Sequence, residues 1–542
     1  RIPYATPPIR DLRFEKPRPP QKWAGIRDAT EYGPACMSNS SMTTSPQKWI
    51  DEDCLHVNIF AGVDCLEKAC PVVFYIHGGG FNYDSAVMFN DEFLINNFGG
   101  NGSFYLHTGD KTGSSLSIVL LEDVVLVIPG VRLGFFGLLN FDDEDVVPAN
   151  IAAYDLIAAL QFVQKDIKPF GGNPDDVTLF GHSQGATTVA QFLFSKEIDP
   201  SRKYRRIAQR LHATWPSILG SISDVGWRSL QPYATIISYS NLPHWKSCKK
   251  KQSKSSTEGV VNCLRQVDAF ELLRIQREME DDDRRRRPGG LAMSSPLFKG
   301  SNLQSFLRNP LPRPVLAGTT SREFDDERNG DWLSCITDFL GIKNQDEILK
   351  QYRKDNLSGK IQGNLKDQLF INLGINNRLK DNVQVYLYSY RNPRRPYHVD
   401  DLSYIMGIHP FEYDENDKVL AVVYPQFFID FIKTAKPRED WTPLQAELDN
   451  YMYIDVDVKN HSMPHMENYY EHDVIDYWKS LVELDKILSG KNQTVAAQRA
   501  VNTSVTSTSI LDLLLAALPV AAVAMVILMT ACTVRQRNQQ RR

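Results

Sequence analysis

The chain has 542 residues, of which 42% are hydrophobic and 23% are charged, so it is long enough to bury a large core. Its formal net charge is −4 at pH 7, and acidic and basic residues are mixed along most of the chain. This balance gives no reason to expect a nucleic-acid partner, which would favour a basic patch. The run of both signs at residues 281–287 is interpreted as a solvated loop.

The N-terminal part combines an irregular segment with two predicted strands. Residues 1–35 are rich in proline, which fixes φ and removes a backbone donor, so they are expected to wrap over a surface. Apolar alternation predicts a strand within residues 52–60, and the apolar run 71–76 predicts a strand buried on both faces. The sequence His-Gly-Gly-Gly-Phe at residues 77–81 follows that buried strand directly.

This glycine triplet is the first candidate site. The backbone N–H groups of a glycine loop can converge on one point and stabilise an oxyanion, which singles out Gly79 and Gly80. A flexible turn is the alternative. A phosphate-binding loop is disfavoured because Phe81 and Asn82 stand where Gly-Lys-Ser/Thr would be needed.

The second candidate site is a serine turn at residues 177–186, which follows a predicted helix at residues 151–165. The pattern predicts a short apolar strand, a tight turn that carries Ser183, and the start of a helix. Gly181 and Gly185 bracket the serine at G-x-S-x-G spacing, which is typical of a strained turn with an exposed nucleophilic hydroxyl. Ordinary loops also contain this spacing, so the motif alone does not decide between the two interpretations.

The C-terminal region is expected to anchor the chain in a membrane. Residues 513–534 form an uncharged apolar run about as long as a bilayer-spanning helix requires. The basic tail 535–542 indicates the cytoplasmic side, and the polar segment 486–512 is interpreted as a stalk. A buried core helix and a lipid-anchor signal are the disfavoured alternatives. We therefore expect a single-pass type I protein with an extracellular or lumenal domain at residues 1–485. Because Arg1 is not an initiator, its signal peptide is expected to be missing from this chain.

The cysteines and the glycosylation sequons also fit an extracellular or lumenal location, where the environment is oxidising. Two disulfides are predicted to close polar loops, Cys36–Cys54 and Cys248–Cys263. The pairing of Cys65, Cys70 and Cys335 is left open. The candidate N-glycosylation sites are Asn39, Asn101, Asn356, Asn460, Asn492 and Asn502.

Several stretches together resemble the type B carboxylesterase/cholinesterase family, and they occur in that family's order. They are Ile2-Pro-Tyr-Ala, Leu12-Arg-Phe, residues 52–58, the glycine loop, residues 132–137, residues 150–155, residues 170–174 and the serine turn. The resemblance covers most of residues 1–485 and implies an α/β-hydrolase fold, with a mostly parallel central sheet flanked by helices. Residues 98–122 depart from the family pattern and are interpreted as a loop insertion. Residues 200–230 also depart from it, as a surface excursion or an artefact of gene modelling.

The resemblance also implies an acid and a base, which follow the serine along the chain in α/β-hydrolases. An apolar strand and a glycine turn lead to Glu323, which resembles the acid of the family's Gly-Thr-x-x-Glu segment. His398 follows a strand-like run at residues 383–389, resembles the family's His-x-x-Asp/Glu-Leu segment, and is the expected base. The backbone N–H of Gln184 is expected to complete the oxyanion hole. The competing residues are Asp325, Asp326 and Glu327 for the acid, and His409, His461, His465 and His472 for the base.

The expected activity is hydrolysis of small-molecule carboxylic esters through an acyl-enzyme, without a metal or cofactor. His182 and Gln184 stand where the family commonly has Glu and Ala, and we expect His182 to point away from the serine. Trp49 does not have the spacing of the choline-site tryptophan, so acetylcholine is disfavoured as a substrate. The alternative is a catalytically silent adhesion or receptor protein of the same fold, similar to neuroligins. A homodimer is left open.

Overall fold

The structure is a computed structural model, and it describes most of the first 500 residues. The described residues are 1–38, 49–98, 102–107, 115–120, 123–139, 144–195, 198, 204–210, 257–281, 291, 295–297, 313–322, 337, 342–357, 384–445 and 447–500. Glu323, Cys248, Cys335 and the predicted membrane span 513–534 lie outside the described residues, and so do Asn39, Asn101 and Asn502.

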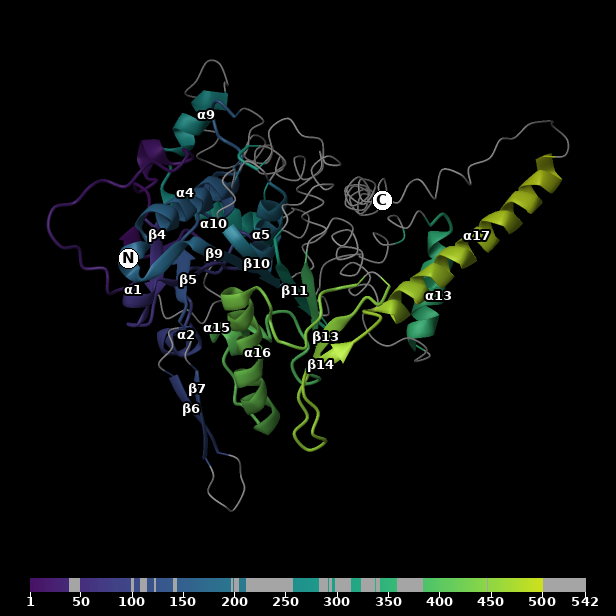
Figure 1. Ribbon diagram of the computed structural model, residues 1–542. Helices are drawn as coiled ribbons and strands as arrows, with labels where there is room; N and C mark the ends of the chain where they lie inside the picture. The colour runs from purple at the N-terminus through teal and green to yellow at the C-terminus, as the bar shows by residue number, and fades with distance from the viewer. Residues whose placement is uncertain are drawn as a thin grey trace.

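Ten strands of the described chain form one sheet (Figure 1). The order is β1 (Ile2–Pro3), β4 (His56–Phe60), β8 (Val125–Pro129), β5 (Cys70–Ile76), β9 (Gly172–His182), β10 (Tyr204–Arg210), β11 (Val315–Thr320), β12 (Val385–Tyr390), β13 (Tyr451–Ile454) and β14 (His465–Glu467). Neighbours pair in parallel from β8 through β13 and antiparallel at both edges. The prediction of a mostly parallel central sheet is therefore confirmed.

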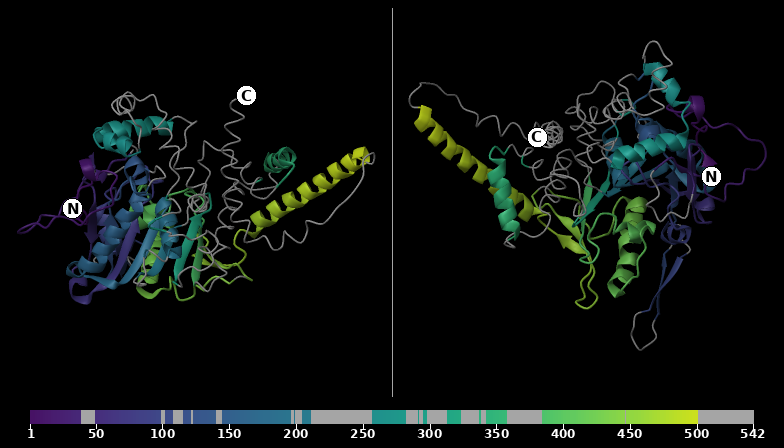
Figure 2. Two further views of the ribbon diagram at one scale, coloured as in Figure 1. Left: turned by 90° about the horizontal axis from the view of Figure 1, so that it is seen from above. Right: turned by 180° about the vertical axis from the view of Figure 1, so that it is seen from behind.

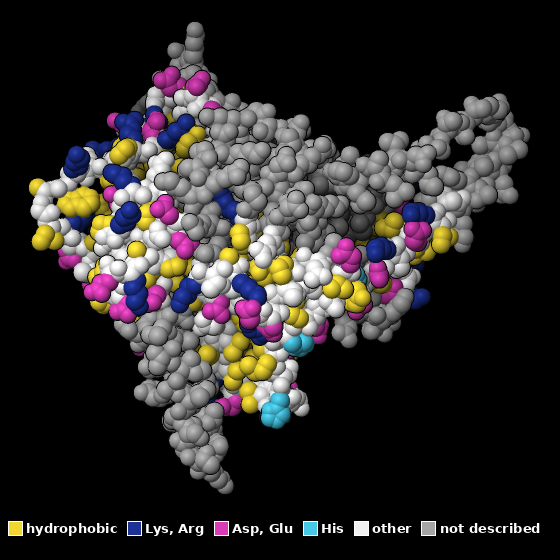
Figure 3. Space-filling view, in the orientation of Figure 1, with side chains coloured by type: hydrophobic (Ala, Val, Ile, Leu, Met, Phe, Trp, Pro, Cys, Tyr) yellow, Lys and Arg dark blue, Asp and Glu magenta, His cyan; other side chains and the backbone are white. Residues whose placement is uncertain are grey.

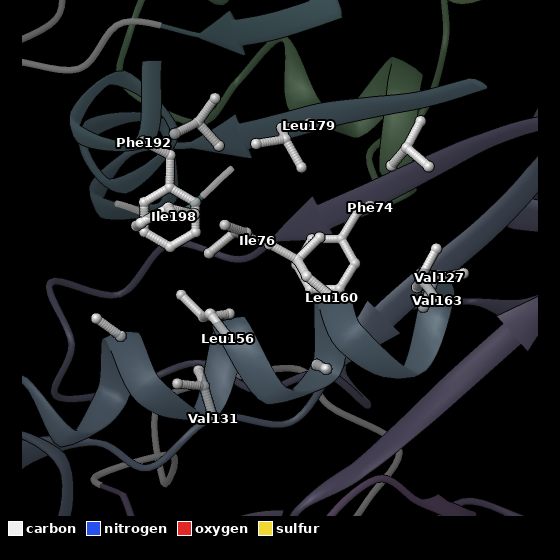
Figure 4. Close-up of a cluster of buried hydrophobic side chains, with 14 of the residues drawn as sticks. Phe74, Ile76, Val127, Val131, Leu156, Leu160, Val163, Leu179, Phe192 and Ile198 are labelled. Atoms are coloured by element: carbon white, nitrogen blue, oxygen red, sulfur yellow. The ribbon is translucent and has the colours of Figure 1, made fainter. Parts of the chain in front are cut away.

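Helices cover both faces of this sheet because successive side chains of a strand point to opposite sides. Phe74 and Ile76 of β5 join the core under α4 (Ile151–Asp166), whose Leu156, Leu160 and Val163 meet them (Figure 4). Tyr75, between them, belongs to the other core, under α16 (Glu415–Thr434). The central strand β5 is thus buried on both faces, as its continuous apolar sequence predicts.

The remaining helices lie around this three-layer body. α5 (Gln184–Phe194) follows β9, whereas α9 (Thr257–Leu264), α10 (Ala269–Asp281) and α3 (Gly134–Leu138) share a smaller apolar cluster. α17 (His472–Ala500) projects away from the sheet beside α13 (Gln345–Leu357) (Figures 1 and 2). Within the described chain, no helix combines the length and apolar character needed to cross a bilayer.

Three local predictions differ from the structure. The predicted loop insertion contains a hairpin of β6 (Gly102–His107) and β7 (Ser115–Leu120), since β-branched and apolar residues in β7 outweigh the surrounding glycines. The predicted surface excursion contains β10, which lies in the sheet between β9 and β11 despite its arginines. Gly318, expected in a turn, lies inside β11, where an added Cβ would be 2.2 Å from the Tyr388 ring.

Two complete disulfides lie within the described residues. Cys36 and Cys54 are bonded, as predicted, and Cys65 is bonded to Cys70. Cys263 is also disulfide-bonded, while its expected partner lies outside the described residues. On the face shown in Figure 3, acidic and basic side chains of the described residues are interspersed, in line with the near-balanced composition.

A capping box stabilises the N-terminus of α16, the helix that covers one face of the sheet. The Asp414 side chain accepts from the N–H groups of Asn416 and Asp417, and the Asp417 side chain accepts from Asp414 N in return. Asp414→Ala removes this capping box, together with an exposed ion pair to Arg394, and is expected to lower the free energy of unfolding by about 1–2 kcal/mol. Urea unfolding measures the loss. The control Glu415→Ala removes only an exposed pair with Lys418, and equal losses in both variants would contradict the assignment.

Candidate active site

Ser183 occupies a strained turn between the end of β9 and the start of α5. Its backbone has φ 54° and ψ −124°, and its residue is 6% exposed. A non-glycine residue in such a region costs on the order of 1–3 kcal/mol, and this kind of strain is concentrated at functional sites. The predicted turn geometry is therefore present at the serine.

The bracketing glycines are required by close backbone contacts. A Cβ at Gly181 would lie 2.3 Å from the Gly185 carbonyl oxygen. A Cβ at Gly185 would lie 2.0 Å from the carbonyl oxygen of Ile76, the last residue of β5. The G-x-S-x-G spacing thus closes the turn on itself and presses it against the neighbouring strand.

The glycine loop that leaves β5 packs directly on the serine. A Cβ at Gly78 would be 2.9 Å from the Ser183 Cβ. Gly79 has φ 88°, and its carbonyl accepts from Asn82 N and Tyr83 N at 2.9 and 3.1 Å. Within the described chain, the N–H groups of Gly79 and Gly80 donate no hydrogen bond, so both remain available to a ligand.

His77 orients one of these free N–H groups. Its Nδ1 donates to the Gly78 carbonyl at 2.9 Å, and burial lowers the pKa of His77 to about 4, so the ring is neutral near pH 7. The Gly78 carbonyl and the Gly79 N–H belong to one planar trans peptide and point in opposite directions. Holding the carbonyl therefore also fixes the direction of the Gly79 N–H. His77 opens the His-Gly-Gly-Gly-Phe motif, but the sequence analysis assigns a role only to the glycines of that motif.

The start of α5 supplies a further donor beside the serine. Gln184 is the first residue of the helix and is 2% exposed. The first N–H groups of a helix have no partner within it, and the helix dipole favours negative charge there. The buried side-chain Nε2 of Gln184 also has no partner among the described residues.

His398 lies in a tight turn after β12. Asp400 accepts from Tyr397 N at 2.9 Å across this turn, and Val399 has φ 80°, which is an outlier for a β-branched residue. Arg322 pairs with Tyr397 in an isolated parallel bridge, and its N–H donates to the Pro396 carbonyl at 2.9 Å. The residue before Glu323 is thus paired with the residue before His398. Glu323 itself, with the competing Asp325, Asp326 and Glu327, lies outside the described residues.

A ring contact brings His398 to the serine turn. The imidazoles of His182 and His398 are stacked, with centroids 5.3 Å apart and planes at 19°. Among the competing histidines, His465 bonds to Glu467 and His472 to Asp449, while His461 lies exposed in the turn before β14. His409 follows α15 (Leu402–Met406). In the described part of the chain, none of these four forms such a ring contact with the serine turn.

His182 makes a contact that the sequence analysis does not include. Its ring lies against the ring of the expected base, and the residue is 2% exposed. Residues of one strand alternate between faces, but the turn at Ser183 breaks this regularity. The contact also depends on a loop from β12, which is separated from β9 by two strands. No local pattern in the sequence indicates it.

Asp84 is a further residue beside the glycine loop that no sequence motif indicates. It has φ 65°, and its Cβ is 3.0 Å from the position of a Cβ at Gly79. Burial raises the pKa of Asp84 to about 6. A carboxylate in this position makes the surroundings of the glycine loop sensitive to pH.

The raised pKa of Asp84 predicts a stability change with a definite sign. Between pH 3.8 and about 6 the folded state binds more protons than the unfolded state, so stability falls as pH rises through this window. Asp84→Asn is expected to raise the free energy of unfolding by about 1 kcal/mol above pH 6, a value reduced for partial solvent exposure. Denaturant unfolding at pH 4 and pH 8 measures the change. A gain of equal size at both pH values would show that burial of the Asp84 carboxylate is not its cause.

One group of possible metal ligands, Cys65, Cys70 and Asp123, lies close together in the described chain. Cys65 and Cys70 form a disulfide with each other, and Asp123 bonds to Lys68 at 3.0 Å. A disulfide sulfur is no thiolate and a paired carboxylate is already neutralised, so this group does not fit a metal ion.

Comparison with known proteins gives a consistent result. A family model described as the carboxylesterase family matches residues 1–478. The chain is 26% identical to human cocaine esterase over 489 residues, covering 82% of this chain and 80% of that protein. It is 26% identical to the rat pyrethroid hydrolase Ces2e over 518 residues, covering 84% and 81%. Carboxylesterase 5A of mouse is 32% identical over 287 residues, covering 51% of this chain but only 43% of that protein.

The fold is also found among solved structures. A structure of PNB esterase covers 89% of this chain and 94% of its own, with a TM-score of 0.61 and 21% identity. A second PNB esterase structure gives a TM-score of 0.63 at 20% identity. At this identity the likeness concerns the fold alone.

Proposed function

Because this chain belongs to the carboxylesterase family, we propose that it hydrolyses carboxylic esters by a serine mechanism in which Ser183 is the nucleophile. The observation that carries the proposal is the strained Ser183 turn, on which the glycine loop packs with two free N–H groups. The proposed base is His398, which reaches this turn through its contact with His182. The proposed acid is Glu323, one residue after the bridge that joins Arg322 to Tyr397.

In the proposed acylation step, Ser183 Oγ attacks the ester carbonyl carbon while His398 accepts the hydroxyl proton. The carbonyl π electrons move to oxygen, and the N–H groups of Gly79, Gly80 and Gln184 stabilise the resulting oxyanion. The carbon–oxygen bond to the alcohol then breaks, and His398 gives its proton to the leaving alcohol. Glu323 orients the imidazole and stabilises its charged form.

Deacylation repeats these steps with water as the nucleophile. Water loses a proton to His398 and attacks the acyl-enzyme carbonyl, forming a second oxyanion in the same site. Collapse of this intermediate returns the proton to Ser183 Oγ and releases the carboxylic acid. The cycle uses only this chain's own groups and water.

Labelling with a fluorophosphonate, which reacts with activated serines, tests the proposal. We expect the wild-type protein to be labelled at neutral pH and Ser183→Ala to stay unlabelled. Circular dichroism shows that both samples are folded. A folded wild-type protein that remains unlabelled would contradict the proposal and favour the catalytically silent adhesion or receptor protein.

The proposed location is a membrane facing the extracellular or lumenal side, with residues 513–534 as the anchor and residues 535–542 in the cytoplasm. The supports are the apolar run with its basic tail, the disulfides, and the exposed sequon residue Asn460. α17 continues to Ala500, so the proposed stalk at residues 486–512 begins as a helix. Expression of the chain behind a signal peptide, with carbonate extraction and deglycosylation, tests the topology. A carbonate-soluble, unglycosylated product would contradict it.

A further inference from the structure

Two stacked imidazoles bring the serine turn and the loop after β12 into contact. The rings of His182 and His398 lie 5.3 Å apart at 19°, which is a parallel stack. His182 is the last residue of β9 and His398 belongs to a turn beyond β12. β10 and β11 lie between these two strands in the sheet. The stack therefore joins parts of the chain that are distant both in sequence and in sheet order.

The edge of the His182 ring lies against the glycine loop. A Cβ added at Gly78 would be 2.9 Å from His182 Nδ1 and 2.9 Å from Ser183 Cβ. Any larger residue at position 78 would therefore collide with both neighbours. His182 thus lies between the loop that presents the free N–H groups and the ring of His398. His182 is 2% exposed, so its ring is enclosed by protein.

We propose that His182 is a positioning residue that holds the ring plane of His398, so that His398 faces Ser183 in the orientation required for proton transfer. This inference rests on the proposed function. A base must lie within hydrogen-bond reach of the proton that it accepts. A displacement of about 1 Å can therefore lower the reaction rate by about 10²-fold. A flat ring stacked on His398 fixes its plane without occupying either nitrogen.

Two residues that can carry a charge adjoin His182 in the fold. His398 lies across the stack from His182, and Arg210 is the register partner of His182 on β10.

Three substitutions of His182 separate positioning from simple packing. His182→Ala removes the ring, His182→Phe keeps a flat ring that cannot titrate, and His182→Glu supplies a carboxylate. The readouts are kcat, KM and the pH dependence of kcat/KM for an uncharged p-nitrophenyl ester, from about pH 5 to about pH 9. Thr178→Ala, a buried change earlier in β9, serves as the control for general weakening of the strand.

We expect His182→Ala to lower kcat at least about tenfold with little change in KM, because the base loses its orientation. His182→Phe should recover most of this loss. His182→Glu should move the acid limb of the profile to higher pH by about one unit, because a carboxylate stabilises the imidazolium of His398. Thr178→Ala should keep the wild-type kcat and profile.

Equal kcat values for the alanine and phenylalanine variants, together with an unmoved acid limb in His182→Glu, would overturn the inference. If His182→Ala does not fold, the comparison of His182→Phe with His182→Glu still decides, because both fill the space and only one carries charge. A wild-type protein that neither hydrolyses the ester nor reacts with a fluorophosphonate would instead overturn the proposed function. The two failures are therefore distinguishable.

Discussion

Ser183→Ala is expected to lower the rate of ester hydrolysis on the order of 10⁶-fold, the largest single effect in this protein. Alanine keeps a Cβ at a residue with φ 54°, so the strained turn and the packing on Gly78 are preserved. What disappears is the hydroxyl that forms the acyl-enzyme. Stopped-flow or long-time-course hydrolysis of a p-nitrophenyl ester measures the loss.

A second buried serine provides the matched control for this substitution. Ser195 directly follows α5, is fully buried, and its Oγ donates to the Leu297 carbonyl at 2.6 Å. Ser195→Ala is expected to cost about 1 kcal/mol of stability and to retain the hydrolytic rate. Retention of more than about 1% of the wild-type rate in Ser183→Ala would show that another residue is the nucleophile.

Gly79→Ala is expected to lower kcat by about 10²–10³-fold, equivalent to about 2.7–4 kcal/mol of transition-state stabilisation. The new Cβ would lie 2.0 Å from the Tyr83 carbonyl oxygen and 2.6 Å from its carbon, and both are backbone atoms. Gly79 also has φ 88°, where side chains are strained. The loop must shift to relieve these contacts, and its N–H groups would then leave the positions that meet the oxyanion.

Gly80→Ala is the comparison that makes this prediction specific. Gly80 also has a positive φ, 57°, but an added Cβ there meets nothing within 4 Å. We therefore expect only the backbone strain, about 1–2 kcal/mol of stability, and a kcat loss of no more than about tenfold. Steady-state kinetics of both variants, with thermal unfolding in parallel, measures the difference. Equal losses of kcat would show that the geometry of Gly79 is not what the reaction requires.

The sequence predicts well those features that depend on neighbouring residues. The apolar run before the glycine loop forms β5, and the G-x-S-x-G turn has a backbone strained at Ser183. Both depend on local rules, namely burial on two faces and the absence of Cβ atoms where backbones meet. The mostly parallel sheet follows from the resemblance to a family, and the structure confirms it.

Features that depend on distant segments were not predictable in the same way. β10 takes a place in the sheet because β9 and β11 lie on either side of it, although its own sequence is rich in arginine. The stack of His182 on His398 requires the loop from β12 to reach over two strands. The raised pKa of Asp84 arises from burial beside the glycine loop, which no pattern around residue 84 indicates.

The most direct test of the central claim is to locate the covalent bond that the protein forms during reaction. The wild-type chain is treated with a fluorophosphonate, digested, and mapped by mass spectrometry. We predict a single adduct on the peptide that contains Ser183, and no adduct after Ser183→Ala. An adduct on a different residue, or none on a folded protein, would contradict the account of Ser183 as the nucleophile.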